Sequence, residues 1–216
     1  MIDIQDIIVK NVSYQPNARS SLEKEVSIGS IIKGIKNGKL SNEITRLRSF
    51  LKDNDREKYD IHKKRLPAVT FCGSFIGGRR KELISEYHKI VVIDIDKLSE
   101  DDFIKIKTYL EEDLYVFTFW VSPSESGFKG LIHLDFDFDI AKFGIDISHK
   151  MAFDQIADYF QESYSVKLDL SGSDTTRLCF LSYDPNLVFK SEINSFSVKK
   201  MEVRKEIKNT FGKAER

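Results

Sequence analysis

The stretch from residue 90 to residue 170 carries strand and helix patterns in an order that few folds accommodate. The run "IVVIDID" at 90–96 is apolar and of strand length. The next segment, "SEDDFIKIKTYLEED", begins with the N-cap candidate Ser99 and repeats apolar residues at helical spacing. The later segments are expected to be strands at 114–122, 128–139 and 166–170 and a helix at 153–164, and a further strand is expected at 177–184. The order β-α-β-β-α-β predicts an α+β fold built on a split β-α-β, ferredoxin-like sheet.

The first 89 residues are expected to mix strands and helices in a second unit. The predicted elements are a strand at 7–14, helices at 25–37 and 41–65, and a short strand at 66–75. Ser41 or Asn42 is the expected N-cap of the second helix. A glycine turn and the basic cluster Arg79-Arg80-Lys81 follow the second strand.

A net charge of zero conceals three blocks of opposite sign. Residues 1–89 hold 18 Lys and Arg against 11 Asp and Glu, residues 90–189 hold 8 against 19, and the remainder holds 8 against 4. An acidic part suits cations and basic flanks suit anions such as nucleic acid, although chance surface composition explains the blocks equally well. We therefore expect a basic N-terminal α/β subdomain at 1–89, an acidic subdomain at 90–198, and a charged tail or linker at 199–216.

Two acids stand at the end of the apolar run. Because side chains alternate along a strand, Asp94 and Asp96 share one face, about 6 to 7 Å apart. Carboxylates at a strand end are good ligands for Mg²⁺, which prefers oxygen and keeps several waters or phosphates. The alternative is a solvated strand end at which Lys97 serves as the counter-ion.

A serine-rich turn and a basic strand face follow at 122–138. Ser122, Ser124 and Ser126 offer small hydroxyl donors suited to phosphate oxygens. In the next strand, Lys129 and His133 share a polar face, where a histidine could bind a phosphate or orient a nucleotide. The alternative is an ordinary hairpin turn with a surface histidine.

A third group of polar residues lies at 166–187. Asp169 is an acid between two leucines, and Asp174 and Arg177 follow after a Ser/Gly turn. Arg is the natural bidentate partner of a phosphate, but a local Asp174–Arg177 salt bridge explains the pair as well. If the strands of these three groups are neighbours in one sheet, the acids and the basic groups converge as two-metal nucleotidyl transfer requires.

Bulk properties predict a soluble, cytoplasmic protein. The longest apolar runs fall short of the roughly 18 residues that span a bilayer, and the N-terminus resembles no signal peptide. Two cysteines, Cys72 and Cys179, provide neither a disulfide framework nor a zinc site. We expect no membrane partner.

The ordered motifs resemble a known family. The "DID" strand, "SPSESGFKGLIHL", "LDLSGSDTTRLCFLSYDP" and the preceding "KKRLPAVTFCGSF" are similar to the VirE N-terminal-domain family of bacterial mobile elements. That family is grouped with the archaeo-eukaryotic primase superfamily, which includes primase-polymerases. The resemblance spans roughly residues 60 to 190, and it implies an RRM-like, primase-type palm in residues 90–198 behind the N-terminal subdomain.

The resemblance also implies roles for single residues. Asp94 and Asp96 match the DxD motif and Asp169 the third motif, so these three would be catalytic and would hold Mg²⁺ or Mn²⁺ as the cofactor. His133 matches the second motif only in part, because Leu131 and Ile132 stand where a small residue is expected. Together with the serine turn, the expected nucleotide-binding residues are Ser122, Ser124, Lys129, His133 and Arg177.

The leading hypothesis is a DNA primase or DNA-directed polymerase type of nucleotidyltransferase in mobile-element or phage replication. It would use single-stranded DNA and nucleoside triphosphates, with a replicative helicase as a partner, and its basic first half would hold the template. The alternatives are a catalytically silent nucleic-acid-binding replication module of the same fold and a metal-dependent nuclease. A relaxase with an H-x-H motif is excluded, because no such spacing occurs among His62, His88, His133 and His149.

Overall fold

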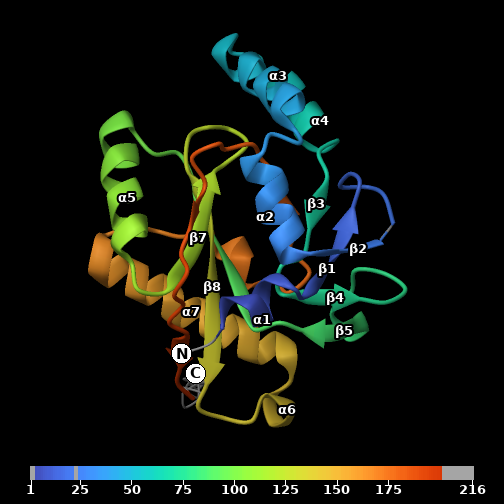
Figure 1. Cartoon of the computed structure of the whole chain (residues 1–216), viewed down its shortest axis with the longest axis vertical. Coiled ribbons are helices and arrows are strands. Elements are labelled where there is room, and N and C mark those ends of the chain that lie inside the picture. Colours follow the sequence, from blue (N-terminus) through green and yellow to red (C-terminus); the bar gives the residue numbers. More distant parts are fainter. Residues whose placement is uncertain (1–2, 22–23, 201–216) are drawn as a thin grey trace, which may run out of the picture.

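The computed structural model describes residues 3–21 and 24–200 and has a mixed α+β architecture (Figure 1). The predicted α+β class is therefore confirmed. The tail expected at 199–216 lies, from residue 201 onward, outside the described residues.

The larger sheet is built around β8 (Phe128–Phe136), which lies between β6 (Ile90–Ile95) and β7 (Val116–Val121) and runs antiparallel to both. Helix α5 (Glu100–Glu112) connects β6 to β7, and Ser99 caps it, as predicted, by accepting a hydrogen bond from the Asp102 N–H at 3.1 Å. Two short strands complete the sheet. They are β10 (Val188–Phe189), antiparallel to β7, and β11 (Phe196–Val198), parallel to the far end of β8.

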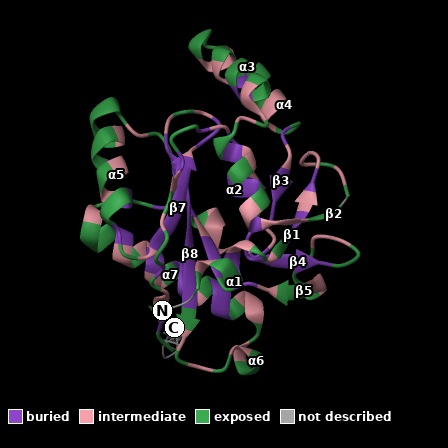
Figure 2. Cartoon of the chain, viewed as in Figure 1, coloured by how far each residue is buried: buried purple, intermediate pink, exposed green. Residues whose placement is uncertain are grey.

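Helix α7 (Ile145–Tyr164), preceded by the short α6 (Ile140–Phe143), packs with α5 on one face of this sheet. Figure 2 shows β7 and β8 buried along most of their length, whereas α5 turns an exposed side to solvent. Aliphatic and aromatic side chains of the strands and both helices form one continuous core, among them Ile93, Leu110, Ile132, Phe153 and Ile156.

The strand expected at 166–170 does not form. The chain is extended beside β6, but a single backbone hydrogen bond, from the Asp169 N–H to the Asp94 carbonyl at 3.0 Å, joins the two. The Asp169 side chain then accepts from the Ser171 N–H at 3.0 Å and turns the chain into the 3-10 helix η2 (Leu170–Ser173). This local side-chain hydrogen bond competes with strand pairing and ends it after one residue.

A smaller four-stranded sheet lies beside the larger one. Its order is β2 (Lys24–Ser27), β1 (Asn11–Gln15), β3 (Ala68–Val69) and β9 (Cys179–Phe180), with a separate hairpin of β4 (Gly73–Phe75) and β5 (Ile84–Tyr87) next to β1. Helices α1 (Ile4–Ile8) and α2 (Ile28–Lys36) pack on this sheet. The predicted strand at 7–14 thus starts at Asn11, because Asp3 caps a short helix ahead of it.

The helix expected at 41–65 is two helices, α3 (Ser41–Lys52) and α4 (Arg56–Lys63). Asn54 adopts a left-handed backbone with φ of 57°, a conformation that Asn tolerates better than most residues. Asp55 then caps α4 by accepting from the Lys58 N–H at 3.0 Å. Neither Ser41 nor Asn42 caps α3, which starts after Leu40 without a side-chain cap.

The two sheets share residues across the boundary expected at 89/90. Strand β9 follows α7 in the chain, yet it pairs with β3 of the smaller sheet. The strand predicted at 177–184 is reduced to this two-residue pairing. One hydrophobic core joins Val12 and Ile28 of the first part to Phe117, Trp120 and Leu131 of the larger sheet.

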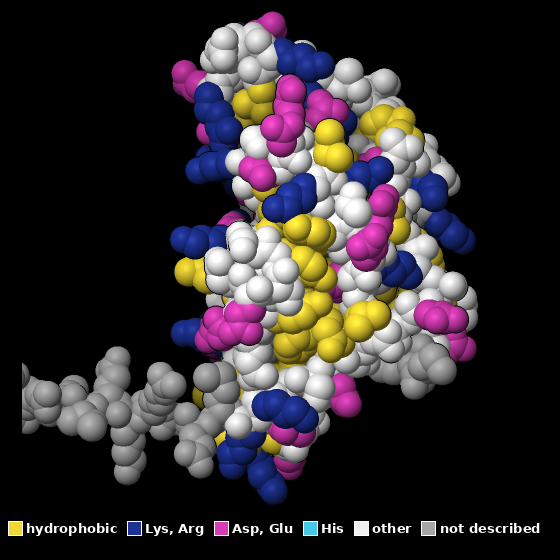
Figure 3. Space-filling model, turned by 90° about the vertical axis from the view of Figure 1, so that its left-hand side faces the viewer, with side chains coloured by type: hydrophobic (Ala, Val, Ile, Leu, Met, Phe, Trp, Pro, Cys, Tyr) yellow, Lys and Arg dark blue, Asp and Glu magenta, His cyan; other side chains and the backbone are white. Residues whose placement is uncertain are grey.

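Figure 3 shows the side of the molecule on which α5 lies. Hydrophobic side chains gather in the middle of this face, and charged side chains of both signs surround them. In the described part of the chain, no helix combines the length and the apolar character needed to cross a membrane.

Candidate functional site

Three carboxylates meet at the edge of the larger sheet. Asp94 lies near the end of β6, Asp96 directly follows this strand, and Asp169 arrives on the extended segment after α7. One oxygen atom from each lies within 4.8 Å of the other two. The backbone hydrogen bond from Asp169 to Asp94 fixes this approach. We call these three residues the acidic cluster; strand alternation and the third group of polar residues predicted its members.

Lys129 lies against the acidic cluster. It stands opposite Asp94 in the pairing of β6 with β8, and its ammonium group forms an ion pair with Asp94 Oδ2. The two side chains are only 9% and 14% exposed. Burial alone would lower the pKa of Lys129, but the charge of Asp94 reverses this, so the pKa is raised and the lysine stays charged.

The other carboxylates differ in their surroundings. Asp96 is exposed as a residue, but partial desolvation of its carboxyl, followed by the charge of Asp94, raises the pKa of that carboxyl. Burial would also raise the pKa of Asp169, but hydrogen bonds from Ser171 and the charge of Arg177 outweigh it and lower the pKa. Arg177 Nη2 lies 3.6 Å from Asp169 Oδ2. The alternative of a local Asp174–Arg177 salt bridge is thus replaced by a pair between Arg177 and Asp169, which lies farther away in the sequence.

The donor set suits a hard divalent cation. All three candidate ligands are carboxylates, and Mg²⁺ and Mn²⁺ favour such oxygen ligands. Among the described residues, the buried Asp94 Oδ1 has no hydrogen-bond partner. A buried polar atom without a partner is costly, so a cation at this atom would satisfy it. Asp94, Asp96 and Asp169 thus fit the predicted metal site.

The serine turn lies against the end of β6. The Leu98 N–H donates to the Ser126 carbonyl at 2.9 Å, and Gly127 packs directly on the Ile95 carbonyl. The hydroxyls of Ser122, Ser124 and Ser126 form a chain, with oxygen–oxygen distances of 3.0 and 2.9 Å. Of the predicted nucleotide-binding residues, Ser122 and Ser124 therefore lie at the same end of the sheet as Asp96.

His133 is not part of this arrangement. It pairs with Ile90, four residues along β8 from Lys129, which corresponds to about 13 Å along the strand. Its Nδ1 lies 2.9 Å from Ser195 Oγ, and burial followed by the charge of Lys89 lowers its pKa to about 4. Lys129, and not His133, is the basic residue of β8 beside the acidic cluster. Alternation placed both on one face, but it could not tell which of them stands opposite Asp94.

Two further residues belong to the site and were not predicted. Lys63 is half-buried and lies at the end of α4, where the charges of Lys129, Asp96 and Asp94 act on its ammonium group. Burial of this group and, second, the charge of Lys129 lower the pKa of Lys63. His149 of α7 holds η2 in place, with Nε2 3.3 Å from the Gly172 carbonyl. No local sequence pattern singled out Lys63, which lies in an element far from Asp94 and Asp96 in the sequence.

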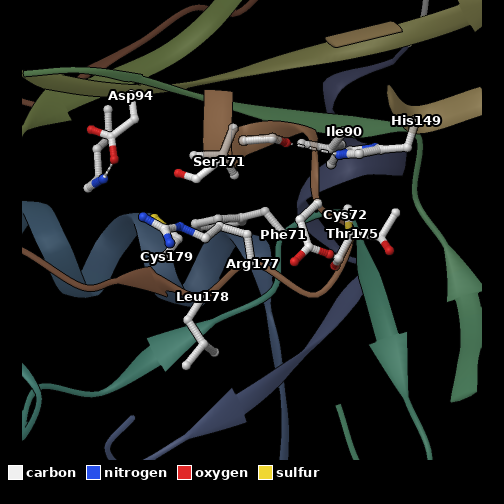
Figure 4. A pocket seen from close by; sticks show the side chains of 14 residues that line it. Phe71, Cys72, Ile90, Asp94, His149, Ser171, Thr175, Arg177, Leu178 and Cys179 are labelled. Carbon is white, nitrogen blue, oxygen red and sulfur yellow. Dashed lines mark hydrogen bonds and ion pairs between the residues drawn. The ribbon is translucent and has the colours of Figure 1, made fainter. Parts of the chain in front are cut away.

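A narrow pocket connects these groups (Figure 4). Asp94 and Arg177 line one part of it, and His149, Cys72 and Thr175 line the other. Its volume is about 30 Å³, room for one or two water molecules. The pocket is therefore too small to enclose a ligand of nucleotide size.

Residues 61–189 match the family model described as "BT4734-like, N-terminal domain". The match covers more than half of the 216 residues. The chain belongs to the BT4734-like N-terminal domain family. The matched region of this BT4734-like domain includes the acidic cluster, Lys63, Lys129, the serine turn and Arg177. No curated protein and no solved structure matches the chain at a significant level. The family model differs in name from the VirE N-terminal-domain family, to which the relation stays a prediction.

Proposed function

We propose that this BT4734-like domain is a metal-dependent nucleotidyltransferase of the primase-polymerase type that acts on single-stranded DNA. The observation that carries the proposal is the meeting of Asp94, Asp96 and Asp169 within 4.8 Å, at the end of the sheet where the serine turn also lies. Clustered carboxylates with nearby cationic side chains suit the binding of divalent ions and a triphosphate.

The strand pairing supports this proposal. Strands β6 and β7 are parallel to each other, α5 connects them, and β8 lies between them, so these elements form a split β-α-β unit. The segment 166–169 takes the place of a fourth strand beside β6. We propose that this unit is a ferredoxin-like palm of the archaeo-eukaryotic primase type, related to VirE N-terminal domains. A fold alone does not define an activity, so the proposal depends on the site residues.

The proposed role of each residue follows from its position. Asp94, Asp96 and Asp169 would hold Mg²⁺ or Mn²⁺, which would neutralise triphosphate charge and activate the attacking hydroxyl. Arg177, exposed beside Asp169, and Lys63, held by α4, would bind phosphate oxygens. The hydroxyls of Ser122 and Ser124 would donate hydrogen bonds to the same nucleotide.

One observation favours a second candidate, a silent nucleic-acid-binding module. The ion pair with Lys129 already neutralises Asp94 and occupies one of its oxygens. An amine in this position competes with a cation for the carboxylate. In that case the acidic cluster stabilises the sheet, and nucleic acid is bound without a reaction.

Template extension distinguishes the two candidates. The purified chain is incubated with primed and unprimed single-stranded DNA, labelled ribo- or deoxynucleotides, and Mg²⁺ or Mn²⁺. Asp96→Asn is the test variant because Asp96 is exposed, and Asp135→Asn, an exposed acid of β8 outside the acidic cluster, is the matched control. We expect extension by the wild type and by Asp135→Asn, and a loss of roughly 100-fold or more in Asp96→Asn.

Three other results would change the conclusion. Equal extension by all three proteins would exclude the acidic cluster as the reacting centre. Metal-dependent shortening of labelled DNA, lost in Asp96→Asn, would identify a nuclease. If no protein alters the DNA but all of them bind it, the silent module is the better description.

A further inference from the structure

Two hollows lie next to each other on the N-terminal part, away from the acidic cluster. The first, of about 540 Å³, is lined by the loop after β1 and by the glycine turn of the β4–β5 hairpin, including Arg19, Gly77 and Arg79. The second, of about 360 Å³, is lined by the same loop and by the end of α4, including Ile61, Lys64 and Arg65. Arg19 lines both, so the two hollows adjoin each other, and we call them together the basic groove.

The charge of the basic groove has one sign. Its lining contains the four cationic residues Arg19, Lys64, Arg65 and Arg79. No Asp or Glu is among the described residues that line either hollow. Arg79 is fixed in place, because its Nε donates to Gln15 Oε1 at 2.9 Å and its Nη1 donates to the Thr176 carbonyl. In the described part of the chain none of these four cations forms an ion pair, and such a group in a concave surface attracts a polyanion.

Two cationic residues that lie between the basic groove and the acidic cluster connect them. On one side, Arg79 binds the carbonyl of Thr176, and the next residue, Arg177, pairs with Asp169. On the other side, Lys63 is near enough for the charges of Asp96 and Asp94 to act on its ammonium group, whereas its neighbours Lys64 and Arg65 line the groove. A chain of phosphates lying in the groove could therefore continue to the cluster along cationic side chains.

Apolar side chains at the groove favour a single strand over a duplex. Ile61, which lines the second hollow, is 45% exposed, and Ile76, next to the glycine turn, is 69% exposed. The base faces of a duplex are hidden in its stack, whereas the unstacked bases of a single strand can cover such side chains. Exposed isoleucines between cations are thus better suited to single-stranded nucleic acid.

We propose that the basic groove binds the phosphates of the single-stranded DNA that is delivered to the acidic cluster. This inference rests on the proposed function for the identity of the polyanion, and it adds the surface and the residues. Four phosphate contacts predict a distinct salt dependence, because each contact on a single strand contributes about −0.7 to the slope of log K against log salt. The expected slope for the groove is about −2.8.

The test measures binding of labelled oligo(dT) to the full chain by fluorescence anisotropy, between about 50 and 200 mM salt and without nucleotide. The test variant is Arg19→Ala/Arg65→Ala, two exposed residues of the groove. Lys142→Ala/Lys150→Ala, on exposed positions of α6 and α7, removes the same charge at the other end of the molecule from α4 (Figure 1). We expect the first variant to bind about 25-fold more weakly near 0.1 M salt with a slope of about −1.4, and the second to bind like the wild type.

The outcomes separate the groove from the proposed activity. Equal binding by all three proteins, or equal weakening in both variants, would overturn the groove, while template extension would still test the acidic cluster. If Asp96→Asn loses extension but binds oligo(dT) normally, and Arg19→Ala/Arg65→Ala loses binding, both proposals hold. Preference for duplex DNA, or binding of poly-glutamate as tight as that of oligo(dT), would overturn the single strand as the ligand.

Discussion

The buried ammonium group of Lys129 pairs directly with Asp94 and also interacts through its charge with Asp96 and Asp169. A buried charge is tolerated when it has a partner and is costly when the partner is removed. At the residue scale, the pair therefore links the stability of the sheet edge to whatever occupies the acidic cluster.

Lys129→Met should destabilise the protein in the presence of a chelator. Methionine keeps the length of the side chain but leaves the buried Asp94 carboxylate without its counter-ion, and breaking such a pair costs about 3 kcal/mol. If the acidic cluster binds divalent ions, Mn²⁺ should restore a large part of this loss by replacing the missing charge. Urea unfolding with chelator and with Mn²⁺ measures both effects.

Lys142→Met serves as the control, because the ion pair of Lys142 with Asp139 is exposed to solvent. Such exposed pairs contribute less than about 1 kcal/mol to the free energy of unfolding. A loss in Lys129→Met that Mn²⁺ leaves unchanged would show that the acidic cluster does not take up a cation. Unchanged stability without Mn²⁺ would mean that Asp94 does not depend on its lysine.

Some of the site residues were predictable from the sequence and others were not. The common position of Asp94 and Asp96 was predictable from strand alternation, because two acids separated by one residue in a strand lie on the same face. The distinction between Lys129 and His133 depends on the register of β6 against β8, which the serine turn and the packing around Gly127 set. Lys63 comes from an element about 30 residues earlier in the chain, and local patterns carry no information on such contacts.

At the element scale, the turn between β7 and β8 holds the end of β6 by direct backbone contact. A Cβ atom on Gly127 would lie 1.8 Å from the Ile95 carbonyl oxygen and 3.0 Å from the Asp96 Cα. Both neighbours are backbone atoms, which cannot move aside as a flexible side chain can. The position of Asp96 in the acidic cluster thus depends on the absence of a side chain at residue 127.

Gly127→Ala should therefore displace the end of β6 and disturb the acidic cluster. We expect a loss of about 2 kcal/mol or more in the free energy of unfolding, together with weaker binding of Mn²⁺. Urea unfolding and Mn²⁺ titration by paramagnetic line broadening measure the two effects. Gly34→Ala, within α2, is the control. Its new methyl group makes only ordinary contacts with Lys39, beyond the end of the helix, so we expect a gain of roughly 0.5 to 1 kcal/mol. Normal stability and Mn²⁺ binding in Gly127→Ala would contradict the close contact.

The predicted elements succeeded where the pattern was long and failed where a single side chain decided the backbone. Strands β6, β7 and β8 and helix α5 have continuous patterns and were expected within a few residues of their bounds. The segment 166–170 has the composition of a strand, but the hydrogen bond within Asp169–Ser171 bends it. Likewise, Asn54 divides the helix expected at 41–65, because its left-handed backbone interrupts a pattern that otherwise remains helical.

At the scale of the whole molecule, the two sheets share a hydrophobic core, and a strand from the later part of the chain belongs to the smaller sheet. The chain leaves the first part after β5, builds the larger sheet, and returns to place β9 beside β3. Arg48 of α3 also donates hydrogen bonds to the carbonyls of Ser122 and Tyr183, at 3.3 and 3.1 Å. A boundary at 89/90, which the charge blocks suggested, thus cuts across hydrogen bonds and a shared core.

Residues 90–200 expressed alone should fail to fold cooperatively. Without the first part, the almost fully buried side chains of Phe117, Trp120 and Leu131 lose the partners that cover them, and β9 loses its pairing with β3. Exposing these three side chains costs about 2 kcal/mol each, or about 6 kcal/mol in all, which is comparable to the stability of a whole domain.

Trp120 is the only tryptophan and packs against Phe71, so its fluorescence reports directly on this interface. We expect a red-shifted emission and no urea transition in the fragment, and a blue-shifted emission with one transition in the full chain. A fragment with buried Trp120 and a sharp transition would establish the larger sheet as an independent domain, and the first part would then be a cover over the acidic cluster.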